Sequence, residues 1–332
     1  MFRAIRVDEP ALNQPNVFIV NDLTVDALMP GDVTVDVEYS SINYKDALSI
    51  AGRPGIIRDY PLIPGTDLVG TVARSDHPDW SRGDRVLVNG YGLGETHHGG
   101  LAEKAKVRSE WLTRVPDAFS TKQAAAIGTA GLTAMLAILA LENLNALPEP
   151  GSTVDVLVTG ATGGVGSIAI ALLNHRGNEV TAVTGRRHEA DYLLNLGATT
   201  IIDRSELNKP GKPMRSERWG AAIDVVGGIT LANVLTQINR GGAVATCGLA
   251  ESRELPTTVL PFILRNIALT GVNSAHASTE QRVDAWDRLA RYLDLSKLEL
   301  MTSTITLAEV EDFAPSMLAG HGRGRTVVDV RA

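Results

Sequence analysis

The stretch VTGATGGVGSIAIALL (158–173) decides how the middle of this chain is interpreted, because it joins two apolar segments through a cluster of glycines. The apolar run VDVLV (154–158) ends where the stretch begins, and the apolar segment SIAIALLNH (167–175) follows the glycines. This order of strand, tight turn and helix is the context in which a glycine-rich turn can hold phosphate groups. In the pattern G-x-G-x-x-G, Ala161, Gly163 and Gly166 occupy the three glycine positions. The first is therefore an alanine, and Gly160 and Gly164 add the flexibility that the turn needs.

Such a turn has a physical purpose at the start of a helix. It lets backbone N–H groups approach a pyrophosphate at the end where the helix dipole favours negative charge. A tight turn without a ligand is the alternative interpretation. We expect a dinucleotide site whose phosphate-binding residues are Ala161, Thr162, Gly163, Gly164, Val165 and Gly166.

The next apolar run indicates which dinucleotide is bound. In an NAD site, an acidic residue about 20 residues further on bonds the ribose 2′-hydroxyl. Here AVTGRR (182–187) has no acid at that place, and it offers the Thr184 hydroxyl, Gly185 and the Arg186 guanidinium. A charge-assisted hydrogen bond to a 2′-phosphate contributes about 1.5–3 kcal/mol. The sequence therefore predicts NADPH rather than NADH, unless Arg186, or more readily Arg187, is merely solvated at a helix start.

The chain is organised in three blocks around this turn. Up to about residue 117, β-rich runs such as VTVDVEYSSI (33–42) alternate with turns and indicate an antiparallel domain. From about 151 to 270, apolar β-runs alternate with helical segments, which predicts a doubly wound α/β domain with a parallel sheet. The tail holds a charged helix, TEQRVDAWDRLARYLDL (279–295), and a strand, GRTVVDVRA (324–332), that we expect to complete the first domain.

Composition excludes several classes of protein. The 332 residues are 44% apolar and carry a formal net charge of −7, without a basic stripe, which argues against a nucleic-acid partner. The apolar stretch 124–141 follows a capping box of Ser120 and Gln123, so we expect a buried helix and no membrane partner. One cysteine, Cys247, permits no internal disulfide, and because MFRAIRVDEP (1–10) lacks an apolar run after its arginines we expect no secretory signal. We expect a cytoplasmic protein in which Cys247 is a buried, inert thiol.

A family resemblance runs along nearly the whole chain. It is carried in order by PGTDLVGTV (64–72), GDRVLV (83–88), GGLAEKAKV (99–107), IGTAGLTA (127–134), GATGGVG (160–166), IDVVGG (223–228) and GRTVV (324–328). The chain resembles the zinc-free quinone-oxidoreductase branch of the medium-chain dehydrogenase/reductase superfamily. Within that branch, GETHHGGLAEKAKV (94–107) and LPTTVLPFILRNIALTGVNS (255–274) are similar to NADPH-dependent acrylyl-CoA reductases. The resemblance implies a GroES-like catalytic domain (1–125 and 271–332), a Rossmann NADPH-binding domain (126–270) and a homodimer.

The residues predict that no metal takes part. The alcohol dehydrogenases of this superfamily have a catalytic Cys where this chain has Asn43, and the lobe of four cysteines that holds their structural zinc is missing here. The seven histidines are scattered, apart from the adjacent His97 and His98. Without a Lewis acid, reducing an activated double bond is easier than oxidising an alcohol.

Such a reduction needs hydride at the β-carbon, a proton at the α-carbon and donors preset at the carbonyl oxygen. The loop NYKD (43–46) offers these groups. We interpret Tyr44 as the active-site donor, either as a proton source or as a contact to the nicotinamide, with a packing aromatic as the alternative. Asn43 is a second catalytic candidate that could equally brace the loop with Asp46.

Further cofactor contacts are implied by the resemblance alone. Thr129 would lie near the nicotinamide, although a Thr in an apolar helix can instead bond its own backbone. Arg204 would reach the adenosine side, and Arg325 would close the pocket. Three more residues would border the nicotinamide half: Leu249, Ile263 and Asn273.

The substrate implied by the resemblance is a small molecule, an α,β-unsaturated thioester or enone. Acrylyl-CoA reduced to propanoyl-CoA is the leading interpretation, and Arg53 and Arg58 could bind the phosphates of CoA. Two alternatives stay open: an NADPH:quinone or enone oxidoreductase that uses the same site, and a non-catalytic NADPH-binding sensor.

Overall fold

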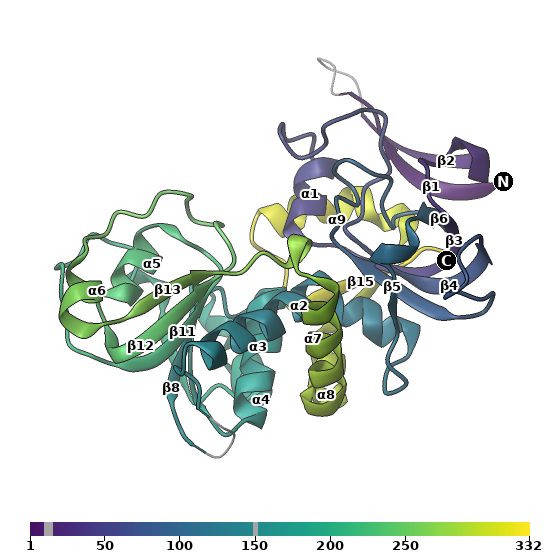
Figure 1. Cartoon of the computed structure of the whole chain (residues 1–332). Helices are drawn as coiled ribbons and strands as arrows, with labels where there is room; N and C mark the ends of the chain where they lie inside the picture. Colours follow the sequence, from purple (N-terminus) through teal and green to yellow (C-terminus); the bar gives the residue numbers. More distant parts are fainter. Residues whose placement is uncertain (10–15, 149–151) are drawn as a thin grey trace. The chain divides into compact units, whose positions relative to one another are not determined.

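The computed structural model describes residues 1–9, 16–148 and 152–332. Contacts within the chain divide it into two compact units (Figure 1). Unit 1 comprises Met1–Thr129, Ser274–Ala290 and Thr302–Ala332, and unit 2 comprises Ala130–Asn273 and Arg291–Met301. The two units are described separately below.

Unit 1 is built on a largely antiparallel sheet. Its strands lie in the order β14 (Thr302–Thr306), β15 (Arg325–Asp329), β3 (Val33–Ser41), β4 (Asp67–Ser75), β5 (Arg85–Asn89) and β7 (Thr113–Arg114), with β6 (Lys104–Val107) also pairing with β3. A separate hairpin consists of β1 (Phe2–Val7) and β2 (Val17–Leu23). Along β3, Val33, Val35 and Val37 are fully buried and alternate with partly exposed residues, as in a strand with one face on a core. The antiparallel β-rich first block is therefore confirmed.

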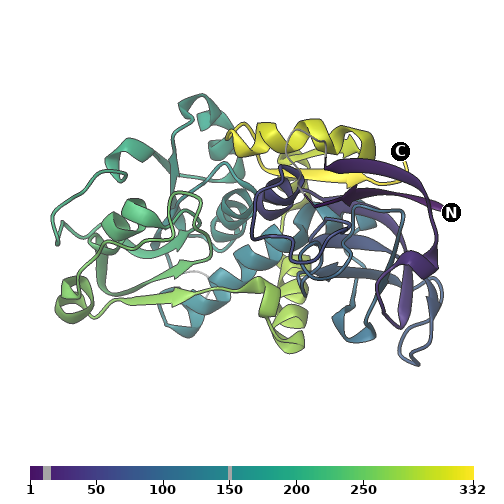
Figure 2. The same cartoon turned by 90° about the horizontal axis from the view of Figure 1, so that it is seen from above.

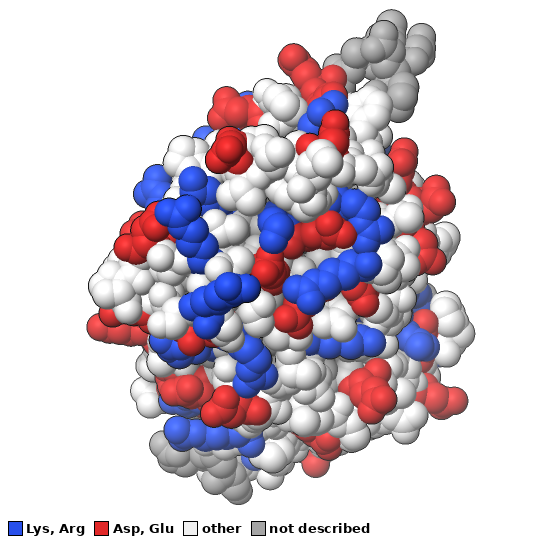
Figure 3. Space-filling model, turned by 90° about the vertical axis from the view of Figure 1, so that its right-hand side faces the viewer, with Lys and Arg blue, Asp and Glu red and all other residues white. Residues whose placement is uncertain are grey.

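In the described part of the chain, four α-helices contribute residues to unit 1 beside this sheet. They are α1 (Tyr44–Ile50), α7 (Thr279–Tyr292), α9 (Val310–Leu318) and the first part of α2 (Thr121–Asn143). Helix α1 packs against α9, and Trp286 of α7 is buried with its ring edge-on to Phe119, 6.2 Å between centroids. On the face seen in Figure 3, Lys and Arg side chains are interspersed with Asp and Glu.

Helix α2 contains the long apolar stretch. In the part of the chain that the structure describes, it is the one helix long and apolar enough to cross a membrane, and 83% of its most apolar window is buried inside the structure. Ser120 N donates to Gln123 Oε1 (2.8 Å) and Gln123 N donates to Ser120 Oγ (3.2 Å), so the predicted capping box is confirmed. The helix is kinked at Gly128, whose φ of 48° is in the left-handed region.

Unit 2 contains a parallel six-stranded sheet (Figure 2). The order is β10 (Thr200–Asp203), β9 (Glu179–Thr184), β8 (Asp155–Val158), β11 (Trp219–Asp224), β12 (Ile238–Thr246) and β13 (Ala268–Gly271). Numbered along the chain from β8, this is the order 3-2-1-4-5-6 of a Rossmann fold. Its helices are α3 (Gly164–His175), α4 (Ala190–Leu196), α5 (Gly228–Leu235), α6 (Leu260–Arg265) and α8 (Leu295–Leu300). The predicted parallel sheet with crossover helices is confirmed.

The tail is divided between the units. Strand β15 pairs antiparallel with β3 and parallel with β14, so it joins the sheet of unit 1. The sequence analysis assigned residues 271–332 to one domain, whereas in the structure helix α8 belongs to unit 2. There Lys297 Nζ donates to Asn174 Oδ1 (2.6 Å) at the end of α3. Short 3-10 helices complete the connections: η1 (Val25–Ala27), η2 (Ser109–Trp111), η3 (Arg187–Glu189), η4 (Arg204–Glu206), η5 (Ser274–His276) and η6 (Leu307–Glu309).

Candidate functional site

The glycine-rich turn in unit 2 has the close backbone approach that phosphate binding requires. Gly160 follows β8 with a φ of 55°, so it takes the tight turn in place of the first motif glycine, where Ala161 stands. Gly163 caps α3 without a side chain. A Cβ on Gly166 would lie 2.5 Å from the Gly160 carbonyl oxygen, so only glycine allows this contact. The first N–H groups of a helix have no acceptor within the helix and point toward any group bound there.

The turn also lies at the switch point of the sheet. Strand β8 has β9 on one side and β11 on the other, and the strand order reverses there. A Cβ on Gly160 would meet Val225 Cγ2 at 2.3 Å, which places the turn against the end of β11. Ligands of open parallel sheets bind outside the carboxyl ends of the strands at such a point.

The residues predicted to recognise the 2′-phosphate come together beside this turn. Arg186 N donates to Thr184 Oγ1 (3.0 Å), and the Arg186 guanidinium bonds Thr162 Oγ1. The Arg204 guanidinium lies over Gly185, where an added Cβ would be 3.1 Å from its Cζ. Two hydroxyls and two guanidinium groups gathered at the end of β9 fit a phosphate group of the size and charge of the 2′-phosphate of NADPH.

One acid in this region was missed by the sequence reasoning. Asp203 ends β10 directly beside Thr184, its partner in the parallel pair. Arg187 Nε donates to Asp203 Oδ2 (2.8 Å), so Arg187 forms an ion pair and is not simply solvated. Hydrogen bonds from Ser205 and from Arg187 hold the pKa of Asp203 far below its usual range.

The residues predicted to border the nicotinamide lie in different places within unit 2. Leu249 follows β12, and a Cβ on Gly227 at the end of β11 would lie 3.5 Å from its Cα. Asn273 follows β13, so both residues come after the carboxyl ends of strands. Ile263 belongs to α6, which precedes β13 (Figure 1). Arg265, the last residue of the same helix, donates to the carbonyls of Thr236 and Ile238 where β12 begins.

Three of the predicted residues of unit 1 contact a carboxylate that the sequence reasoning did not select. Asp67, at the start of β4, is 0% exposed. Its Oδ1 accepts from Asn89 Nδ2 (2.7 Å) and from Thr129 N and Oγ1 (2.9 and 2.6 Å). Its Oδ2 accepts from Ser41 Oγ (2.5 Å) and Asn43 Nδ2 (2.8 Å). Thr129 therefore bonds Asp67, and a lone acid before the apolar run LVGTV (68–72) was the signal available in the sequence.

Arg325, predicted to close the pocket, is instead 3% exposed inside unit 1. Its guanidinium donates to Ala126 O (2.6 Å), Asn43 Oδ1 (3.1 Å) and Ser41 Oγ (2.7 Å), and it lies 3.6 Å from Asp67 Oδ2. Burial lowers its pKa, while Asp67 and Asp46 act in the opposite direction. The side chain thus joins β15, α2 and β3 around a buried ion pair.

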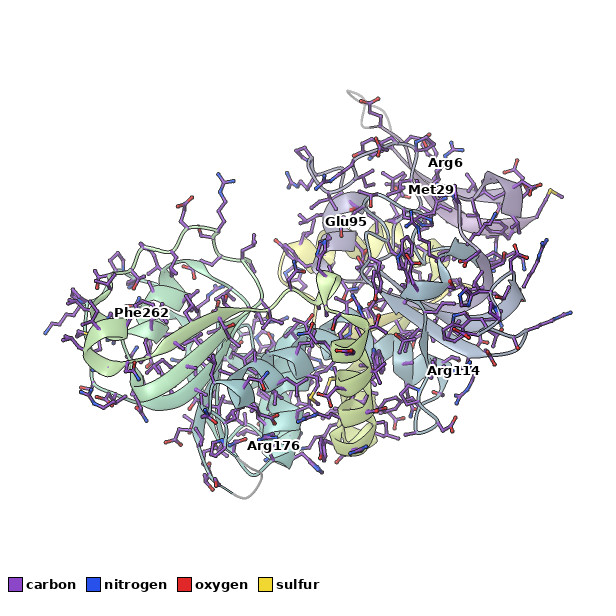
Figure 4. The ribbon with its side chains drawn as sticks, in the orientation of Figure 1. Arg6, Met29, Glu95, Arg114, Arg176 and Phe262 are labelled. Carbon is purple, nitrogen blue, oxygen red and sulfur yellow. The ribbon has the colours of Figure 1, made fainter. Side chains whose placement is uncertain are left out.

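The loop NYKD (43–46) is held by this network. Asp46 accepts from Asn43 N (2.8 Å) and from Thr66 N and Oγ1 (2.8 and 2.7 Å), so the bracing role of Asn43 and Asp46 is observed. Burial raises the pKa of Asp46 to about 6, although these hydrogen bonds act in the opposite direction. Lys45 Nζ pairs with Glu95 Oε1 (2.8 Å), and Glu95 is labelled beside α1 in Figure 4.

Tyr44 differs from its three neighbours in this loop. Its side chain is 50% exposed at the first residue of α1, and within the described residues its hydroxyl has no hydrogen-bond partner. Of the four polar residues of the loop, it is therefore the one whose donor is not used inside unit 1.

Two further predictions concern metals and the cysteine. Among residues 1–9, 16–148 and 152–332, no group of three or more His, Cys, Asp or Glu side chains is arranged to hold a metal ion. Metal-free chemistry stays a prediction. Cys247, predicted to be buried, is half-buried in the structure. Desolvation and then the nearby Asp224 carboxylate raise the pKa of its thiol to about 12, so the thiol is protonated at neutral pH.

Comparison with known proteins gives relatives over the whole chain. Residues 29–117 match the alcohol dehydrogenase GroES-like domain, and residues 164–291 match the zinc-binding dehydrogenase domain. The acrylyl-CoA reductase AcuI of Ruegeria pomeroyi is 46% identical over 333 residues, which cover 100% of both chains.

Two solved structures have nearly the same fold. The yhdH oxidoreductase from Salmonella enterica, in complex with NADP, superposes with a TM-score of 0.93 at 45% identity and 99% coverage of both chains. Bacillus subtilis yhfP with NAD bound superposes with a TM-score of 0.92 at 38% identity and the same coverage, and its curated description is a putative quinone oxidoreductase. The chain belongs to the medium-chain dehydrogenase/reductase superfamily, among its quinone-oxidoreductase-like members.

Proposed function

We propose that this protein is an NADPH-dependent reductase that converts acrylyl-CoA to propanoyl-CoA. The relative with that activity in its name is 46% identical over the full chain, and a solved relative at 45% identity is an NADP complex. The arrangement of Thr162, Thr184, Arg186 and Arg204 supports NADPH as the cofactor.

The observation that carries a catalytic role is the exposed hydroxyl of Tyr44 on a braced loop. Asn43 and Asp46 hydrogen-bond each other, and Asn43 is also bonded to Asp67 and Arg325, so the start of α1 is held rigidly. A donor fixed in this way needs little reorganisation when charge develops on a substrate oxygen. We therefore assign Tyr44 as the donor to the thioester carbonyl or to the α-carbon.

The balance of the reaction is simple. When bound, NADPH supplies the hydride that forms the new C–H bond at the β-carbon. The chain must stabilise the negative charge that moves onto the thioester oxygen and must pass a proton to the α-carbon. The hydroxyl of Tyr44 can do either, because a phenol donates a proton and accepts one back from solvent.

The phosphates of CoA need cations outside the reacting centre. Arg53 and Arg58 follow α1 and are exposed, so their guanidinium groups can reach a ligand. We propose that they contact CoA phosphates. Replacing both by Gln should raise the KM for acrylyl-CoA with little change in kcat, whereas equal changes for acrylyl-CoA and a simple quinone would contradict this assignment.

The test of the proposed function combines substrates with a point variant. NADPH oxidation is followed at 340 nm with acrylyl-CoA, free acrylate and a simple quinone, and then with NADH in place of NADPH. We expect fast turnover with acrylyl-CoA and NADPH, and a loss of kcat of about 100-fold in Tyr44→Phe. Tyr39→Phe, which removes a hydroxyl from β3, is the matched control. Turnover of the quinone alone would favour the quinone-oxidoreductase alternative.

We also propose that the protein is a cytoplasmic homodimer that associates through unit 2. Strand β13 is an edge strand of the parallel sheet, and three apolar residues that precede it in the chain, Val259, Ile263 and Leu264, are 64%, 71% and 51% exposed. Open strand edges and exposed apolar side chains are both typical of an interface. Ile263→Asp should shift the mass measured by light scattering from dimer to monomer, and an unchanged mass would refute this interface.

A further inference from the structure

We propose that Arg187 sets the preference for NADPH over NADH without binding the 2′-phosphate, by neutralising the carboxylate of Asp203. This inference rests on the proposed use of NADPH. In this proposal Thr184, Arg186 and Arg204 contact the 2′-phosphate, and Arg187 acts indirectly through the charge of Asp203.

The register of the sheet places Asp203 at the phosphate-recognition end. Strands β9 and β10 are parallel, and Thr184 and Asp203, the last residues of each, are paired. Neighbouring strands lie about 4.8 Å apart. The next residue along the chain is Arg204, whose guanidinium lies over Gly185. The acid is therefore flanked on both sides by residues that fit a phosphate.

Asp203 is a charged group at this position. Its side chain is 20% exposed, its Oδ1 accepts from Ser205 N (2.8 Å), and its pKa is held far below its usual range. A carboxylate that stays ionised repels a phosphate placed near it, just as an acid at the end of β9 selects against NADPH. Asp203 alone would thus oppose the arginines beside it.

Arg187 cancels this charge from the solvent side. Its Nε donates to Asp203 Oδ2 (2.8 Å) while 80% of its side chain is exposed. The other acids of the neighbouring short helices have partners of their own: Glu189 is 3.8 Å from the His188 ring, and Glu206 is 3.7 Å from the Arg218 guanidinium. Asp203 is the acid that lies directly beside Thr184, so the pairing that matters for the phosphate is the one with Arg187.

A double-mutant cycle on binding tests this inference. Dissociation constants for NADPH and NADH are measured by cofactor fluorescence, without substrate, for the wild type, Arg187→Gln, Asp203→Asn and the double variant. Arg187→Gln should weaken NADPH about two- to fivefold at low ionic strength and leave NADH unchanged, because an exposed charge acts over a short, screened range. Asp203→Asn keeps the acceptor for Ser205 and should bind NADPH at least as tightly as the wild type. The double variant should return to the wild-type affinity.

Other results would overturn the inference. If the double variant binds NADPH as weakly as Arg187→Gln, then Arg187 is itself a phosphate ligand. If NADPH and NADH weaken equally, Arg187 has only a structural role. Arg240→Gln, which removes an exposed positive charge at the start of β12, is the control for net charge and should change neither constant.

These outcomes are separate from those that test the proposed function. Wild-type protein that prefers NADPH but does not reduce acrylyl-CoA would remove the proposed substrate and leave the role of Arg187 intact. If all four proteins of the cycle have the same dissociation constant for NADPH while the wild type still turns over acrylyl-CoA with NADPH, only the role of Arg187 is removed.

Discussion

Replacing Asp67 by Asn should destabilise the protein strongly, because the groups that surround this side chain in unit 1 donate hydrogen bonds and would face the NH2 group of the new amide. Each carboxylate oxygen of Asp67 accepts from at least one group that can only donate: Asn89 Nδ2 and Thr129 N at Oδ1, and Asn43 Nδ2 at Oδ2. Whichever way the Asn side chain turns, its NH2 group faces a donor. Arg325, 3% exposed and 3.6 Å away, also loses its buried counter-ion.

The expected size of the effect comes from this burial. Removing one partner of a buried ion pair costs about 3–5 kcal/mol, because an uncompensated charge stays in the interior. An exposed pair contributes about 0–1 kcal/mol. Asp84 is the matched control, since it pairs with Arg114 (3.0 Å) at a position where the arginine side chain is 60% exposed.

The measurement is urea unfolding followed by circular dichroism for the wild type, Asp67→Asn and Asp84→Asn. We expect a loss of about 3–5 kcal/mol in the first variant and below about 1 kcal/mol in the second. The double variant Asp67→Asn/Arg325→Met should recover part of the loss, because it removes both charges. A loss below about 1 kcal/mol for Asp67→Asn alone would refute the claim that this ion pair holds unit 1 together.

Three other predictions concern single residues. Gly128→Ala should lower the melting temperature more than Gly177→Ala, because both glycines have a positive φ but only a Cβ at 128 meets other atoms, Asp67 Oδ2 at 2.5 Å; equal shifts would contradict this. The folded state raises the pKa of Asp46 to about 6 and so favours its protonated form. The contribution of this protonation to the free energy of unfolding is therefore fully present below the ordinary pKa of 3.8 and is lost as the pH rises through 6. The stability of the wild type relative to Asp46→Asn should thus fall by about 3 kcal/mol over that range, and a difference independent of pH would disprove the raised pKa. Cys247 should react with iodoacetamide at pH 8 far more slowly in the native protein than in urea, and equal rates would show that the thiol is not protected.

Local patterns in the sequence were sufficient for the parallel sheet and for the tight glycine-rich turn before α3. The period of the apolar residues and the position of the glycines depend on neighbours along the chain, so VDVLV (154–158) and Gly166 could be interpreted without a structure. The capping box at Ser120 and Gln123 was predictable for the same reason.

The charged networks were less accessible because they depend on contacts between distant segments. Asp67 and Arg325 are brought together by the pairing of β3 with β4 and with β15. Asp203 meets Arg187 only because β9 and β10 are paired in one register. The resemblance identified Arg325 as a site residue, but its burial among Ser41, Asn43 and Asp67 could be seen only in the fold.

The central claim is tested most directly by identifying the product. Purified protein is incubated with acrylyl-CoA and NADPH. The CoA esters are separated, then identified and quantified by mass spectrometry, and NADPH is quantified in the same sample. The account predicts that one propanoyl-CoA forms for each NADPH consumed and that NADH supports far less product. Recovery of unchanged acrylyl-CoA, with or without consumption of NADPH, would contradict it.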